Sequence, residues 1–110
     1  MRPRDPRARR LVTKVMVTFW EPGSERDYRT GHITNISASG VFITTVAPIA
    51  PPATVDLRLI LGEEEIDIMG EVIRTLGETH FFKQDSGAGM GVRFVDPGSE
   101  AVRTMMEFLT

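Results

Sequence analysis

The chain has 110 residues, a formal net charge of −2 at pH 7 and no cysteine. This length suits one domain with a hydrophobic core, and the lack of cysteine excludes disulfide bonds, thiol catalysis and Cys-based zinc sites. The charge disfavours a general nucleic-acid-binding protein, because such domains usually spread lysine and arginine over a whole face.

No apolar stretch reaches the roughly 18 to 20 residues that cross a bilayer. The N-terminus has arginines but lacks the apolar segment of a secretory signal. We therefore expect no membrane insertion and a cytoplasmic location, which also suits a chain without cysteine.

The first ten residues, MRPRDPRARR, hold five arginines and one aspartate, so the positive charge is local. The spacing of their prolines disfavours a regular helix. We expect residues 1–10 to form a flexible arginine-rich arm and residues 11–110 to form the folded domain.

Apolar and polar residues alternate along the chain as they do in half-buried strands. Proline and glycine interrupt the pattern in two loops, at residues 21–27 and 47–53. An acidic turn at residues 62–65 joins two strands as a hairpin, and residues 77–89 form the longest irregular stretch. The predicted strands cover residues 11–19, 28–36, 41–46, 55–61, 66–72 and 90–95.

A helix is predicted at the C-terminus. Asp96-Pro97 is suited to cap and start it, and apolar residues follow at helical spacing: Val102, Met105, Met106 and Leu109. The methionines are interpreted as core residues. Five or six antiparallel strands followed by one amphipathic helix indicate a mainly β protein, a small barrel with the helix packed on it or plugging one open end.

Several candidate sites have plainer explanations. His32 and His80 lie on separate segments without a nearby histidine partner, so we expect no metal site. The acidic turn Glu63–Glu65 is interpreted as solvated. Ser37 and Ser39 lack an evident base, and neither GAG nor GMG carries the lysine of a phosphate-binding loop, so we expect no catalysis and no cofactor.

The arginine-rich arm and the hexapeptide NISASG at residues 35–40 together make a chemically sensible anion pocket. Guanidinium groups offer forked donors to phosphate and flat surfaces on which bases stack. Asparagine, serine and backbone N–H groups hold the polar edge of a ligand. Each feature alone is weak evidence, because a polar turn usually only turns the chain.

The sequence resembles the PilZ domain family along essentially its whole length. NISASG matches the family pattern [D/N]xSxxG at Asn35, Ser37 and Gly40, and GVFITT continues as the family's next strand does. GMGVRFVD followed by a helix is similar to the family's closing segment. The resemblance implies a six-stranded antiparallel β-barrel with a C-terminal α-helix.

The resemblance also implies a ligand, the bacterial second messenger cyclic di-GMP. By analogy, the arm arginines Arg7, Arg9 and Arg10 contact phosphates and stack on guanine. Asn35 reads a guanine edge and Ser37 supports a phosphate. Gly40 allows a tight backbone path.

The arm departs from the family's RxxxR element, because no two of its arginines stand four apart. Arg10 best matches the second motif arginine, which places Pro6 at the first, and Arg7 would have to substitute. Losing one charge-assisted contact costs roughly 1.5 to 3 kcal/mol, which weakens binding about ten- to hundredfold.

Three hypotheses follow. The first is a noncatalytic cyclic di-GMP receptor that signals to a protein partner in motility, pilus or exopolysaccharide systems. The second is a ligand-independent adaptor of such machinery, in which Asn35 and Ser37 only stabilise the turn. The third is a different small barrel whose arm binds nucleic acid. Phe81 and Phe82 indicate a partner surface or a folded-back lid, and nothing indicates an oligomeric state.

Overall fold

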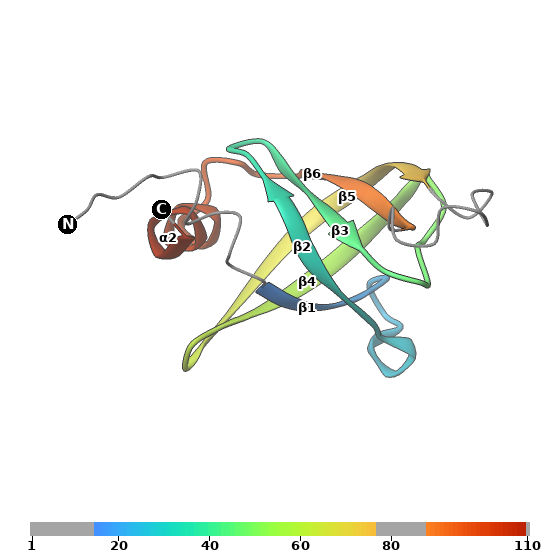
Figure 1. Ribbon diagram of the computed structural model, residues 1–110, viewed down its shortest axis with the longest axis horizontal. Helices are drawn as coiled ribbons and strands as arrows, with labels where there is room; N and C mark the ends of the chain where they lie inside the picture. Colours follow the sequence, from blue (N-terminus) through green and yellow to red (C-terminus); the bar gives the residue numbers. More distant parts are fainter. Residues whose placement is uncertain (1–14, 77–87, 110) are drawn as a thin grey trace.

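The structure is a computed structural model that describes residues 15–76 and 88–109. Six antiparallel strands close into a barrel, and a helix follows them (Figure 1). Around the barrel the strand order is β1-β2-β3-β6-β5-β4. This confirms the predicted fold class. The elements are β1 (Val15–Trp20), a 3₁₀ turn η1 (Glu25–Asp27), β2 (Arg29–Ile36), β3 (Gly40–Thr44), β4 (Ala53–Leu61), β5 (Glu64–Leu76), β6 (Gly89–Phe94) and α2 (Glu100–Leu109).

The interior of the barrel is filled by the apolar residues that alternate along the strands. Phe19 on β1, Ile43 on β3 and Met90 on β6 are completely buried. Leu57 and Leu59 on β4 are 1% exposed. The alternation predicted from the sequence is therefore confirmed, and the barrel is a packed core with its polar residues outside.

Two strands end two or more residues from where the sequence pattern indicated. β3 stops at Thr44, short of Val46. The hydroxyl of Thr45 donates to the carbonyl oxygen of Thr30 and its amide donates to the carbonyl oxygen of Ala88, both at 2.8 Å, and Val46 beyond it is 97% exposed. β5 continues beyond Val72 to Leu76, where it pairs with β6.

The hairpin between β4 and β5 turns on two residues, Gly62 and Glu63, since Leu61 pairs with Glu64. Gly62 has a φ of 65°, which suits a glycine at the first central position of a tight hairpin. The side chains of this acidic turn are exposed, as predicted.

Helix α2 begins later than predicted. Asp96-Pro97 lies in a turn, in which the amide of Ser99 donates to the carbonyl oxygen of Asp96 at 3.0 Å. The cap is Ser99, whose Oγ accepts a hydrogen bond from the amide of Val102 at 3.2 Å. The predicted start at Asp96-Pro97 is wrong because these residues make the turn that redirects the chain from β6 into the helix.

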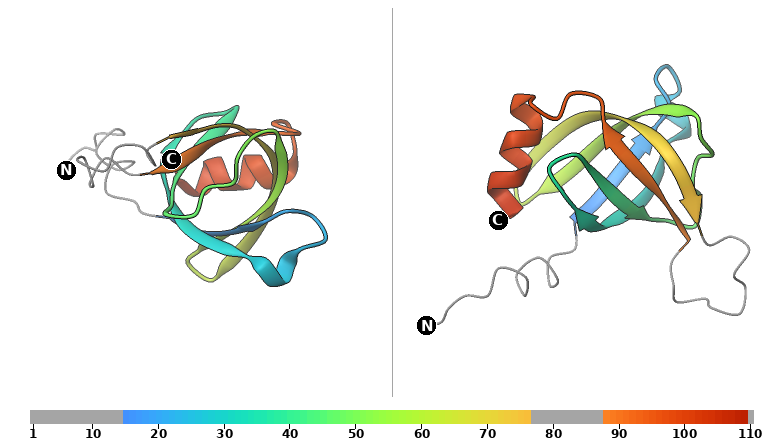
Figure 2. Two further views of the ribbon diagram at one scale, coloured as in Figure 1. Left: turned by 90° about the vertical axis from the view of Figure 1, so that its right-hand side faces the viewer. Right: turned by 90° about the horizontal axis from the view of Figure 1, so that it is seen from above.

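The helix lies across one end of the barrel, as the view along the barrel shows (Figure 2, left). Val102 and Met105 belong to the core cluster, and Met106 and Leu109 pack against it while partly buried. Of the two arrangements expected from the sequence, the helix therefore plugs an open end.

Within residues 15–76 and 88–109, the structure contains no helix with the length and apolar character that a membrane span needs.

Shortening Met105, which is completely buried, should destabilise the domain. We expect Met105→Ala to cost about 2 to 5 kcal/mol of unfolding free energy, through lost burial and the cavity left behind. Met69→Ala is the matched control, because Met69 is 46% exposed; it should cost less than about 1 kcal/mol. Urea unfolding followed by fluorescence of Trp20 measures both. Equal losses in the two variants would contradict a helix that seals the core.

Candidate functional site

A bulge in β2 turns Asn35 to the outside of the barrel. Ile33 pairs with Ile43 and Asn35 pairs with Phe42, so Thr34 is an extra residue in the ladder. Strict alternation from Ile33, which is buried, would have placed Asn35 on the core face. The bulge avoids this, and Asn35 is exposed.

A second bulge, in β5, does the same for Arg74. Val72 pairs with Val92 and Arg74 pairs with Gly91, which leaves Ile73 as the extra residue. Without it, Arg74 would face the core on the same side as Val72. Both Ile73 and Arg74 are exposed on the outer surface.

The two bulges bring Asn35 and Arg74 onto one row across four strands. Asn35 pairs with Phe42, Phe42 with Gly91, and Gly91 with Arg74. We call these four residues the polar row. It crosses β2, β3, β6 and β5 on the outside of the barrel.

Two glycines of β6 make room for the side chains of this row. A Cβ atom at Gly91 would lie 3.4 Å from Cγ and from Nε of Arg74, so the arginine side chain lies over Gly91. A Cβ atom at Gly89 would lie 2.6 Å from Cε2 of Phe42, so the phenyl ring covers Gly89. The GMG sequence therefore serves close packing of neighbouring side chains.

The turn after β2 is held by the side chain of Ser37. Its Oγ accepts hydrogen bonds from the amides of Ser39 and Gly40, both at 3.3 Å. The amide of Ser37 donates to the carbonyl oxygen of Gly40 at 2.9 Å, and the amide of Phe94 donates to the carbonyl oxygen of Ser39 at 2.9 Å. NISASG is thus a tight turn that is anchored to β6. Ser37 is exposed and organises it.

Gly40 is required by the close approach of β3 and β6. A Cβ atom there would clash with the carbonyl oxygen of Val92 and would lie 3.2 Å from Cα of Arg93. The φ angle of Gly40 is not positive. Its role in the structure is therefore to let two backbones approach, and this follows from packing.

One open depression of about 420 Å³ lies on the outer surface. Its lining includes the three residues outside the arm that the sequence predicted as part of a ligand site: Asn35, Ser37 and Gly40. The arm residues Arg7, Arg9 and Arg10 lie outside the described residues, as do His80, Phe81 and Phe82. Two further arginines, Arg74 and Arg93, line the depression. Neither was predicted as a site residue, because neither lies in the arm or in NISASG.

Arg74 and Arg93 differ in their surroundings. Nη2 of Arg93 donates to Oε1 of Glu71 at 2.6 Å, so its charge is already paired. Arg74 makes no ion pair or hydrogen bond through its side chain with any residue in 15–76 or 88–109. The amide of Asn35 likewise has no side-chain partner within those ranges. Among the described residues, the depression therefore presents one guanidinium and one carboxamide whose side chains have no partner.

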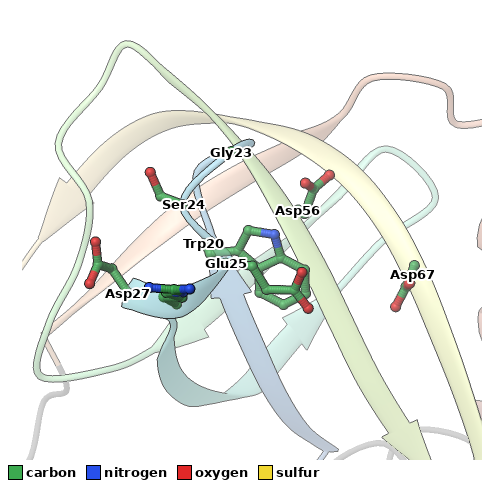
Figure 3. A pocket seen from close by; sticks show the side chains of 8 residues that line it. Trp20, Gly23, Ser24, Glu25, Asp27, Asp56 and Asp67 are labelled. Atoms are coloured by element: carbon green, nitrogen blue, oxygen red, sulfur yellow. The ribbon is translucent and has the colours of Figure 1, made fainter.

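A second pocket, of about 700 Å³, lies beside η1 and has the opposite charge (Figure 3). Figure 3 shows carboxylates from several segments around Trp20: Glu25, Asp27, Asp56 and Asp67. Arg26 also lines this pocket, but the four carboxylates outnumber it, so the lining as a whole repels phosphate and is unsuited to an anionic ligand.

Arg58 next to this pocket is already engaged. Its guanidinium lies 5.1 Å from the ring centroid of Trp20 and its Nε donates to Oδ1 of Asp67 at 2.9 Å. The hydrogen bond and the charge of Asp67 raise the pKa of Arg58. Within the described ranges, no group of three or more His, Asp or Glu side chains could hold a metal ion.

The geometry defines the class of domain: a closed six-stranded barrel with a helix across one end and its polar turn motif on the outer surface. A family model, the PilZ domain, matches residues 2–110. The chain belongs to the PilZ domain family.

Two solved structures share this fold. The Bacillus subtilis inhibitor of motility (MotI/DgrA) has 14% sequence identity and a TM-score of 0.66 over 88% of this chain. The chain covers 45% of that protein, less than half of its length. The PilZ domain of CeSA from a cellulose-synthesizing bacterium has 18% identity and a TM-score of 0.58, over 87% of this chain and 90% of that one. No curated protein sequence matches the chain significantly.

The packing of Gly40 predicts a stability effect that needs no ligand. Gly40→Ala should destabilise the domain by about 1 to 3 kcal/mol, because the new methyl group pushes β3 from β6. Gly98→Ala is the control, since a Cβ there would come no closer than 3.8 Å to Oδ1 of Asp96. Its effect should stay within about 0.5 kcal/mol. Thermal unfolding measures both, and an unchanged midpoint for Gly40→Ala would show that the strands separate without cost.

Proposed function

We propose that this PilZ domain is a noncatalytic receptor for cyclic di-GMP. The observation that carries the proposal is that Asn35 and Ser37, in an intact NxSxxG turn, line one depression together with two arginines. A phosphodiester with purine bases needs cationic donors for its phosphates and a mixed donor and acceptor for a base edge, and this depression offers both kinds of group.

The groups differ in the part of the ligand that they suit. The carboxamide of Asn35 has both a donor and an acceptor for a guanine edge. Ser37 is already hydrogen-bonded within its turn, so its contribution is to fix the loop and to present a hydroxyl to a phosphate. Arginine suits phosphate through its forked N–H groups.

The length of the chain allows the arm to take part. Val15 pairs with Ile33, which is two residues from Asn35. Arg10 is five residues before Val15, a tether of at most about 18 Å when extended. Arg7, Arg9 and Arg10 are therefore proposed as phosphate and base contacts that close over the ligand.

The downstream process is proposed from the proteins of similar fold. One is an inhibitor of motility and the other is a domain of CeSA from a cellulose-synthesizing bacterium. We accordingly propose that the domain acts in the cytoplasm on a protein partner in motility, pilus or exopolysaccharide systems. Its ligand would be a signal, with no reaction and no resident cofactor.

Calorimetric titration of the full chain with cyclic di-GMP tests the proposal. We expect binding heat, and thermal stabilisation equivalent to about 2.7 kcal/mol when the ligand is at a hundred times Kd. Arg10→Ala should weaken binding about ten- to hundredfold, because one charge-assisted contact is lost. Asn35→Ala and Ser37→Ala should weaken it as well, without unfolding the domain.

Two substitutions away from the depression are matched controls. Arg26→Ala removes an exposed arginine of η1, and Ser24→Ala removes a hydroxyl that makes no capping hydrogen bond. Both should leave the affinity unchanged. Absence of heat and of stabilisation in the wild-type protein would refute the receptor function.

A ligand-independent adaptor is the second candidate. It is favoured by the position of Ser37, whose hydroxyl has its hydrogen bonds inside the turn, and by the irregular spacing of the arm arginines. Under this function a partner protein from the native host should be retained equally with and without cyclic di-GMP, and equally by Asn35→Ala. Retention that changes with the nucleotide would favour the receptor instead.

A further inference from the structure

We infer that Arg74 of β5 is a ligand-contacting arginine, which binds a phosphoryl group of the ligand from the barrel side. The inference rests on the proposed function in that the ligand is taken to be a phosphodiester. It adds a residue that the family pattern in this sequence does not contain, and it addresses the irregular spacing of the arm arginines.

A bulge in β5 places the side chain of Arg74 on the outer surface. Arg74 faces outward only because Ile73 is an extra residue in β5. Bulges are typical of places where a strand redirects a side chain near a functional site. The corresponding bulge in β2 exposes Asn35, and the two residues end on the same polar row.

The side chain of Arg74 is held in place by packing and has no counter-ion among the described residues. Cγ and Nε of Arg74 lie over Gly91, which has no side chain to displace them. This contact restricts the arginine stem, while the guanidinium has no ion pair in the described part of the chain. A restricted and unpaired cation loses less entropy and gives up no partner when an anion binds.

Arg93 provides the contrast within the same depression. It would have to exchange the carboxylate of Glu71, at 2.6 Å, for the ligand's phosphate. An exposed ion pair is weak, but the free energy of breaking it is subtracted from that of any new contact. Arg74 should therefore contribute more to binding than Arg93 does.

The spacing of residues along the polar row matches a ligand with separated base and phosphate groups. Asn35 and Arg74 are separated by three inter-strand steps, roughly 14 Å along the sheet before curvature shortens it. Phe42 lies between them with its ring over Gly89. This span fits a ligand that puts a base edge at Asn35 and a phosphate at Arg74, and it is too long for one small anion to bridge.

The test compares two arginines of one depression. Cyclic di-GMP is titrated by calorimetry into wild type, Arg74→Ala and Arg93→Ala, with thermal unfolding as the check on folding. We expect Arg74→Ala to weaken binding about tenfold or more and Arg93→Ala to change it by less than about threefold. Arg74→Lys should restore part of the affinity, because it keeps the charge and loses the planar fork.

Nitrogen-15 NMR separates the failure of this inference from the failure of the proposed function. The Nε–H signal of Arg74 and the amide of Gly91 are followed in titrations with cyclic di-GMP and, separately, with inorganic pyrophosphate at constant ionic strength. One outcome is that cyclic di-GMP does not bind, while pyrophosphate shifts both signals in the wild type and no longer shifts the Gly91 amide in Arg74→Ala. In that case the arginine contact stands and the receptor function fails.

The opposite outcomes overturn the inference. If wild type and Arg74→Ala bind cyclic di-GMP equally, the receptor function stands and Arg74 is not a contact. If neither probe shifts the Nε–H signal of Arg74, the residue binds no phosphoryl group.

Discussion

The polar row depends on the register with which the strands of the barrel pair. In a closed sheet each strand is paired on both sides, so the face on which a residue lies is decided by both of its neighbours. A shift of one residue moves every following side chain to the other face. β2 and β5 each contain one such shift, at Thr34 and at Ile73. Each shift lets the strand keep its apolar residues on the core face and still place a polar residue on the outer face.

The packed interior explains why binding has to take place on the outer surface. Phe19, Ile43 and Met90 are fully buried inside the barrel, and Met105 of α2 is buried with them at one end. A barrel of this size leaves space for side chains but not for a dinucleotide. The depression at the polar row is correspondingly open, and its lining includes Gly91, Ile73, Phe42 and the Ser37 turn.

Local patterns in the sequence were enough to predict the fold but not the whole site. The alternation in β4 is unbroken from Val55 to Leu61, so its buried face could be read directly. β2 contained a readable sign of its bulge, because its two apolar residues, Ile33 and Ile36, both face the core but stand three residues apart, which strict alternation does not allow. In β5 the first residue after the bulge that faces inward again is Thr75. Because Thr75 is polar, the spacing of apolar residues gave no sign of the bulge that exposes Arg74.

Other features depend on pairs of residues that are distant in the sequence. The need for glycine at position 40 arises from the carbonyl oxygen of Val92, and nothing near Gly40 in the sequence indicates that contact. The ion pair that neutralises Arg93 likewise depends on the pairing of β6 with Glu71 of β5. The turn at NISASG could be predicted because its hydrogen bonds are mostly local, formed by Ser37 with Ser39 and Gly40.

The same rigidity limits how a ligand could alter this domain. The polar row crosses four strands whose backbone groups are paired around a closed barrel, so binding there cannot reshape the sheet without breaking several ladder hydrogen bonds at once. Side chains on the surface can move at much lower cost. Arg93 is the clearest example, because it lines both the polar depression and a neighbouring one formed by Pro51, Pro52 and Thr54. An anion that attracted Arg93 would compete with Glu71 for one guanidinium, and the carboxylate left behind would change the charge of the second depression while the barrel stayed as it is.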